Sequence, residues 1–126
     1  MYWTATAALL LGLGVVFGAF GAHALRGRLD EYSIGIYERA VFYQFVNALG
    51  LLMVSMLPRL GWLTQSSATW VCALLFAGIV IFSGSLYALA MSGVRILGAI
   101  TPIGGLCFIA GWFLLAALLY RAAAIR

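Results

Sequence analysis

Four long apolar stretches constrain this chain more than any other feature of its sequence. They cover about residues 3–25, 40–57, 68–91 and 101–120, and every charged side chain lies outside them. A helix needs about 20 apolar residues to cross a hydrocarbon core about 30 Å thick. Hydrophobic residues make up 66% of the chain, a share well above the roughly 45–50% of soluble domains. The sequence therefore predicts an all-α fold, an integral membrane four-helix bundle with short loops, in one domain over residues 1–126.

The charged and nucleophilic residues exclude several classes of function. The net charge of +4 comes from seven arginines, which are scattered at the ends of the apolar stretches and form no basic cluster. Nucleic acid is therefore not an expected partner. We find no nucleophile with a base, no paired carboxylates and no phosphate-binding loop, so no enzyme activity is expected. Cys72 and Cys107 lie far from CxxC spacing and a lone histidine is a weak metal signal, so we expect no metal and no cofactor.

The first apolar stretch carries small residues on two faces when it is read as a helix at about 100° per residue. One face holds Gly14, Gly18, Gly21 and Ala22, and the nearly opposite face holds Gly12, Val16, Ala19 and His23. Small residues let helix backbones approach closely in lipid, where packing and hydrogen bonds replace the hydrophobic effect. We therefore expect this helix to be the central one of the bundle, with a neighbour on each face.

The later spans also carry small residues that are expected to pack against neighbouring helices. These positions are Gly84 and Ser85 in the third span, and Gly104 and Gly105 in the fourth. Thr101 and Pro102 predict the start of the last helix, because proline suits a first helical turn and threonine can cap it. Residues 95–100 then form a short turn at the membrane boundary. The alternative is one longer helix that is kinked at Pro102.

Only one connecting segment has appreciable length. Residues 26–39 carry all three acids together with three arginines, and Ile34 and Tyr37 could lie along the membrane surface. We expect a surface helix or an ordered loop here. Four arginines lie on one side of the predicted spans and three on the other, so the positive-inside rule does not choose an orientation.

Polar side chains in and beside the apolar stretches form the candidate functional site. Amides are unfavourable when they face lipid, so Gln44 and Asn47 in the second span are expected to point into the bundle. Interhelical hydrogen bonds there contribute about 0.6 to 2 kcal/mol each. An ionisable residue at membrane depth is by default a functional-site hypothesis, and the alternative for His23 is a hydrogen-bonded structural role. The predicted intramembrane polar cluster is His23, Arg26, Tyr43, Gln44, Asn47 and Tyr87.

Four motifs follow one another along the chain. Residues 18–25 read GAFGAHAL, residues 43–44 read YQ, residues 84–90 read GSLYALA, and residues 97–105 read LGAITPIGG, with GW at 111–112. In this order they resemble the signatures of domain of unknown function 423, the YgdD/YwdK-like small bacterial membrane proteins, which have transmembrane protein 256 as a eukaryotic relative. The resemblance implies a four-helix, multi-pass protein of the bacterial inner membrane without an established activity. That family usually has a histidine after Tyr-Gln where this chain has Asn47, so a two-histidine haem or metal site is not implied.

Three functions remain open from the residues alone. The first is an accessory or scaffold subunit that packs beside a larger membrane protein complex, since small-residue faces are abundant and almost no mass lies outside the membrane. The second is a small homo-oligomeric transporter or channel that uses the polar cluster and the break at Pro102. The third is a quinone- or lipid-binding pocket in the His23 region. The expected partners are the lipid bilayer and other membrane subunits or further copies of this chain.

Overall fold

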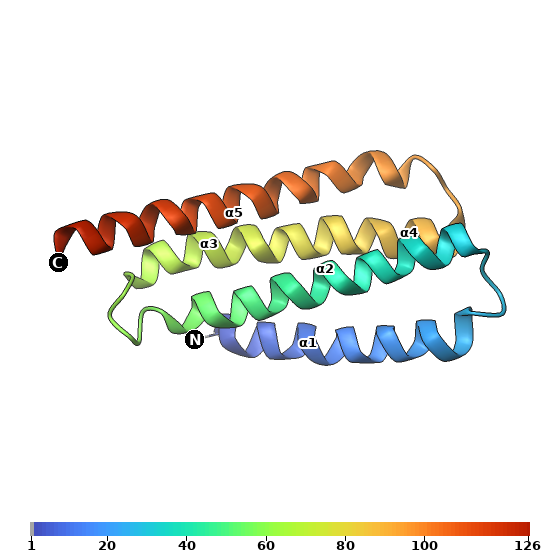
Figure 1. Ribbon diagram of the computed structural model, residues 1–126, viewed down its shortest axis with the longest axis horizontal. Helices are drawn as coiled ribbons and strands as arrows, with labels where there is room; N and C mark the ends of the chain where they lie inside the picture. The colour runs from blue at the N-terminus through green and yellow to red at the C-terminus, as the bar shows by residue number, and fades with distance from the viewer. Residues whose placement is uncertain (1) are drawn as a thin grey trace.

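The structure, a computed structural model, describes residues 2–126 as helices that lie side by side along one common direction (Figure 1). The elements are α1 (Tyr2–Phe20), the π-helical turn η1 (Gly21–Leu25), α2 (Glu31–Met56), α3 (Gln65–Gly78), the π-helical turn η2 (Ile79–Ser83), α4 (Gly84–Ser92) and α5 (Leu97–Ile125). Four continuous helical segments are long and apolar enough to cross a membrane: Tyr2–Leu25, Glu31–Met56, Gln65–Ser92 and Leu97–Ile125. The predicted all-α, four-span fold is confirmed, and the third span consists of α3, η2 and α4 in succession.

The second span begins well before the apolar stretch that revealed it. Asp30 is the N-cap of α2, and its Oδ1 accepts a hydrogen bond from the backbone N–H of Ser33 at 2.8 Å. This bond satisfies one of the backbone donors that a helix leaves free at its start. The expectation of a separate surface helix or loop over residues 26–39 is therefore wrong, because from Glu31 onward this segment is the first part of α2.

The last span also begins earlier than predicted. Gly93, with φ +71°, ends α4 in the left-handed conformation that glycine adopts without strain. α5 then starts at Leu97, so of the turn predicted over residues 95–100 only Arg95 and Ile96 form a turn, and Thr101 is not the cap. α5 is instead one longer helix that includes Pro102, which was the alternative prediction. Pro102 is the sixth residue of α5, so its missing N–H leaves the carbonyl of Gly98 without its usual helical donor.

α2 and the third span are the central helices of the array. α2 packs against α1 on one side and against α3, η2 and α4 on the other, while α5 packs against the third span. We compared one apolar segment of 18 residues in each span. Buried residues make up 17% of this segment in the first and last spans, against 39% in α2 and 44% in the third span. α1 lies at one edge, as Figure 1 shows. The expectation that the first helix is the central one is therefore wrong.

The face of α1 that holds Gly14, Gly18 and Gly21 lies against α2. A Cβ added at these three positions would meet Phe45, Val41 and Tyr37 of α2, in that order. At Gly21 the ring of Tyr37 already fills the space of a side chain. Gly12, on the opposite face, has open space around it and is exposed. One face of α1 is thus covered by this chain and the other is not.

α5 approaches the third span most closely at Gly104. A Cβ at this position would collide with the backbone of Phe82 in η2, and Gly104 is buried. A Cβ at the neighbouring Gly105 would stand 3.8 Å from the Phe82 ring, which is ordinary van der Waals contact. Gly84 is exposed with open space around it, so within residues 2–126 it lies against no other helix.

Buried apolar side chains form two groups between the helices. One group includes Ala48 and Leu51 of α2 together with Leu75 of α3. The other includes Ala40 of α2 and Leu86 of α4. The α2 segment between Ala40 and Ala48 therefore lies at the middle of the bundle, and it carries the polar residues of the candidate site.

Candidate functional site

Gln44 is the residue that joins the most helices in the predicted polar cluster. Its side chain is 2% exposed, and its Nε2 donates a hydrogen bond to the backbone carbonyl of Leu10 in α1 at 2.8 Å. Its Oε1 accepts a hydrogen bond from the hydroxyl of Tyr87 in α4 at 2.6 Å. One amide of α2 thereby fixes α1 and α4 on either side of it.

Tyr37 adds a second hydrogen bond between α1 and α2. Its hydroxyl donates to the carbonyl of Phe17 at 2.5 Å, and its ring lies edge-on to Tyr87 with centroids 5.2 Å apart. Phe17 also meets Tyr87 edge-on, at 5.1 Å. Edge-to-face aromatic contacts contribute about 0.5–1.5 kcal/mol each. Sequence reasoning assigned Tyr37 to the connecting segment, although it lies seven residues before Gln44 and so shares its helix face.

Asn47 joins α2 to α5. Its Oδ1 accepts a hydrogen bond from the indole N–H of Trp112 at 2.9 Å, and its Nδ2 donates to the carbonyl of Tyr43 in its own helix at 3.0 Å. The Trp112 ring lies directly against Gly50, where any side chain would collide with it. Sequence reasoning did not pair these residues, because nothing in the spacing of two distant spans links an amide to an indole.

The π-helical turn η2 lies where the third span meets both of its neighbours. Ser83, which is buried, donates a hydrogen bond to the carbonyl of Ala40 in α2 at 2.8 Å. The hydroxyls of Ser85 in α4 and Thr101 in α5 are 2.6 Å apart and share a hydrogen bond. Isolated π-helical turns are frequent at functional sites. Here a hydroxyl of the turn bonds to α2, and a hydroxyl two residues after the turn bonds to α5.

The structure does not bring the other predicted members into this cluster. His23 is exposed in η1, and Arg26 forms a surface ion pair with Glu38 at 3.6 Å, with both side chains more than half exposed. The ring of Tyr43 packs against Phe82 with centroids 4.6 Å apart, and only its backbone carbonyl takes part in the hydrogen bonds described above. The six predicted residues thus divide into the pair Gln44–Tyr87, the pair Asn47–Tyr43, and two residues at the end of the first span.

His23 is expected to contribute little to stability. Replacing it with alanine should change the free energy of unfolding by less than about 0.5 kcal/mol, as is usual for exposed positions away from caps and networks. The measurement is reversible unfolding in mixed micelles, compared with the unaltered protein. A loss above about 1 kcal/mol would mean that His23 makes a structural contact that its exposed position does not suggest.

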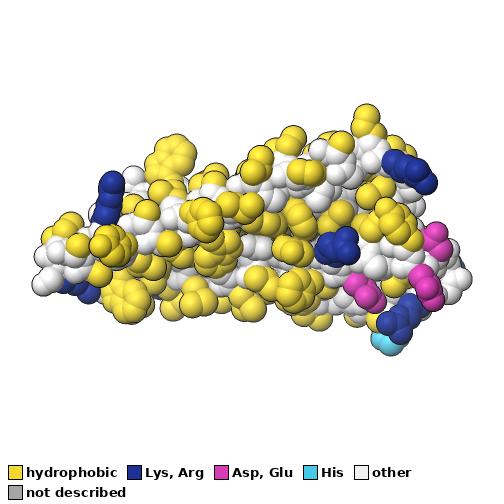
Figure 2. Space-filling model, turned by 45° about the horizontal axis from the view of Figure 1, so that its top comes forward, with side chains coloured by type: hydrophobic (Ala, Val, Ile, Leu, Met, Phe, Trp, Pro, Cys, Tyr) yellow, Lys and Arg dark blue, Asp and Glu magenta, His cyan; other side chains and the backbone are white. Residues whose placement is uncertain are grey.

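The arrangement as a whole holds helices together. Among the described residues, every buried side-chain nitrogen and oxygen has a hydrogen-bond partner. Over the same residues no three histidine, cysteine or acidic side chains are grouped so that they could hold a metal ion. Figure 2 shows an apolar surface over most of the length of the molecule, with the acidic side chains gathered towards one end.

Comparison with known proteins agrees with this picture of a small membrane protein. Residues 17–105 match the family described as a protein of unknown function, DUF423. A UPF0382 membrane protein of Staphylococcus haemolyticus is 49% identical over 108 residues, which cover 86% of each chain. The UPF0382 membrane protein YwdK of Bacillus subtilis is 44% identical over 105 residues, covering 82% of this chain and 83% of YwdK. No solved structure matches the chain. The match to the family and these identities show that the chain belongs to the DUF423 family of small membrane proteins, as its motifs predicted.

Proposed function

We propose that this protein is an accessory or scaffold subunit of the bacterial inner membrane, which packs beside a larger membrane protein or complex. The observation that carries the proposal is the contrast between the two faces of α1. The Gly14 face is covered by α2, whereas Gly12, Val16 and Ala19 on the opposite face are exposed. Small residues on a lipid-facing helix surface let a second helix approach closely.

The interior supports a structural rather than a catalytic role. Gln44 and Asn47 use their amides to bind α1, α4 and α5, and Ser83 uses its hydroxyl to bind α2. Polar side chains that are engaged in this way stabilise one arrangement of helices. A rigid bundle with an uncovered helix face suits a subunit whose role is contact with another membrane protein.

The relatives support the assignment to the bacterial inner membrane. They are named membrane proteins and come from Gram-positive bacteria such as Staphylococcus haemolyticus and Bacillus subtilis. The partners that we propose are the surrounding lipid and another membrane subunit or a second copy of this chain.

Native mass spectrometry of the protein, extracted mildly from its own membrane, tests the proposal. We expect a discrete heavier assembly that contains other membrane subunits. Recovery of the protein as a single unaccompanied chain would count against a scaffold role. A bare homo-oligomer would show that the partner is a second copy of this chain rather than another subunit.

The uncovered face of α1 can be blocked without disturbing the bundle. Gly12→Leu places a side chain where no atom lies within 4 Å in the isolated chain. It should lower the affinity for the partner about tenfold or more, because overpacking a close contact costs about 1–3 kcal/mol and about 1.4 kcal/mol corresponds to a factor of ten. Ala110→Leu, on an exposed position of α5, is the matched control and should leave the assembly intact. Equal assembly of both variants would show that the Gly12 face is not the contact.

A further inference from the structure

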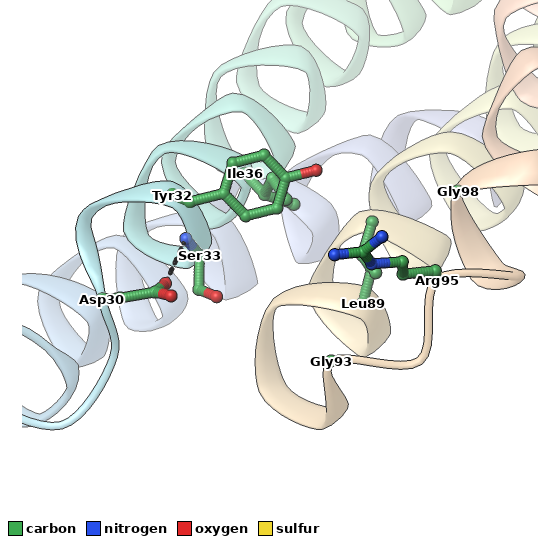
Figure 3. Close-up of a pocket in the computed structure, with 8 residues that line it drawn as sticks. All are labelled: Asp30, Tyr32, Ser33, Ile36, Leu89, Gly93, Arg95 and Gly98. Carbon is green, nitrogen blue, oxygen red and sulfur yellow. Dashed lines mark hydrogen bonds between the residues drawn. The ribbon is translucent and has the colours of Figure 1, made fainter.

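A cleft opens at the end of the molecule where α2 begins and α4 ends. It has a volume of about 610 Å³, within the usual range of pockets that hold small molecules. The start of α2 supplies one wall, and the end of α4 with its connection to α5 supplies the other. Figure 3 shows Asp30, Tyr32 and Ser33 on the α2 side and Arg95 extending from the connection towards them.

The two walls carry opposite charges that do not neutralise each other directly. Within residues 2–126 the one ion pair joins Arg26 to Glu38, so Asp30 and Arg95 face the same cleft without forming a pair. The Asp30 carboxylate is charged at neutral pH, as an exposed aspartate is, and the hydrogen bond from the backbone N–H of Ser33 lowers the pKa of Asp30 further. A cation and an anion therefore stand on opposite sides of a space large enough for a ligand.

The cleft is also partly apolar. Ile36, which is 5% exposed, and Leu89 line it together with the charged groups. Polar groups and apolar side chains in one cleft suit a ligand that is itself amphipathic.

The position of the cleft along the spans indicates where such a ligand would come from. α2 has 26 residues, so it is about 39 Å long at 1.5 Å per residue. This exceeds the hydrocarbon core of about 30 Å and approaches the 40–45 Å of a bilayer with its headgroups. Asp30 and Arg95 lie just outside the ends of spanning helices, at the level where lipid headgroups lie.

We propose that this cleft binds the headgroup of a zwitterionic phospholipid, with its phosphate on Arg95 and its ammonium group on Asp30. The guanidinium of arginine pairs well with phosphate oxygens. Asp30 uses Oδ1 for the helix cap, which leaves Oδ2 to accept a hydrogen bond from an ammonium. The acyl chains then follow the apolar wall at Ile36 and Leu89 into the membrane.

The balance of charge favours a headgroup that carries both signs over a purely anionic one. An anionic headgroup such as phosphatidylglycerol satisfies Arg95 but brings negative charge towards the carboxylate of Asp30. Like charges at close range are unfavourable, whereas an ammonium at the same place is attracted. Phosphatidylethanolamine carries a phosphate and a primary ammonium, and it is the probe that the geometry selects.

Lipid titration of the purified, delipidated full-length protein tests the proposal. Native mass spectrometry would measure binding of phosphatidylethanolamine and of phosphatidylglycerol to the protein in detergent. We expect phosphatidylethanolamine to bind more tightly, and Arg95→Gln to weaken its binding about tenfold through loss of the charge-assisted contact. Arg121→Gln, near the far end of α5, is the matched control and should bind both lipids as the unaltered protein does.

Asp30→Asn tests the role of the negative charge in the cleft independently of Arg95. Asparagine caps a helix about as well as aspartate, so α2 keeps its start while the cleft loses its negative charge. We expect this variant to lose the preference for phosphatidylethanolamine while it keeps or gains affinity for phosphatidylglycerol. Unchanged preference in Asp30→Asn, or unchanged binding in Arg95→Gln, would overturn the proposal. If soluble glycerophosphoethanolamine bound as tightly as phosphatidylethanolamine, the proposal that the ligand is a membrane lipid would be overturned.

Discussion

Gly104→Ala is expected to destabilise the protein, although the same exchange in an open helix position is stabilising. The added methyl group would collide with the backbone of Phe82, and a backbone cannot move aside as a flexible side chain can. α5 would have to move away from η2, which would disturb the hydrogen bond between Thr101 and Ser85 three residues before it. We expect a loss of about 1–3 kcal/mol, the usual effect of overpacking.

Gly105→Ala is the matched control for this experiment. Its methyl group would make ordinary contact with the Phe82 ring at 3.8 Å, and alanine is favoured over glycine in a helix by about 0.8–1.0 kcal/mol. We therefore expect Gly105→Ala to leave stability unchanged or to raise it. Unfolding of both variants in mixed micelles, followed by circular dichroism, measures the difference. Equal stability of the two variants would mean that α5 does not approach η2 at Gly104 as the structure has it.

The number and approximate position of the spans could be predicted because hydropathy reports directly on transfer into lipid. Each apolar stretch is about as long as the membrane is thick, and no charged side chain lies inside any of the four. The ends of the helices were less predictable, since they depend on local backbone chemistry. Asp30 caps α2 among charged residues that resemble a loop, and Gly93 ends α4 so close to Leu97 that residues 93–96 are the whole connection to α5.

The order of the helices in space could not be derived from small-residue stripes. A stripe such as Gly14, Gly18 and Gly21 shows that a helix can be approached closely, but it does not identify the neighbour. The second stripe of α1 has no neighbour within residues 2–126, so counting stripes led to the wrong central helix. α2 is central because it carries buried residues on several faces, among them the polar Gln44 and Asn47.

The polar residues of the candidate site could be predicted, but their hydrogen-bond partners could not. Amides inside an apolar span must find partners, and this identified Gln44 and Asn47 without knowledge of the fold. The identity of the partners depends on the register between spans that are distant in sequence, so Leu10 and Trp112 could not be named. His23 is a candidate because it is ionisable, but the structure places it in η1 with its side chain exposed.

Gln44 and Tyr87 provide the most direct test of these interhelical contacts, because their hydrogen bond can be removed from either side. Gln44→Leu keeps the approximate size of the side chain but leaves the Tyr87 hydroxyl without its acceptor, and it removes the bond to the Leu10 carbonyl. Tyr87→Phe leaves Oε1 of Gln44 without its donor. Each single exchange is expected to cost about 1–3 kcal/mol, because a buried polar group loses its partner.

The double variant separates this pair from the rest of the bundle. Gln44→Leu combined with Tyr87→Phe should lose about 0.6–1.7 kcal/mol less than the sum of the two single variants, the range measured for interhelical hydrogen bonds in membranes. Tyr43→Phe is the matched control, since the hydroxyl of Tyr43 makes no hydrogen bond to residues 2–126 and its ring packs against Phe82. It should change stability by less than about 0.5 kcal/mol. Strict additivity of Gln44→Leu and Tyr87→Phe would show that α2 and α4 are held by apolar packing alone, because a shared hydrogen bond necessarily couples the two exchanges.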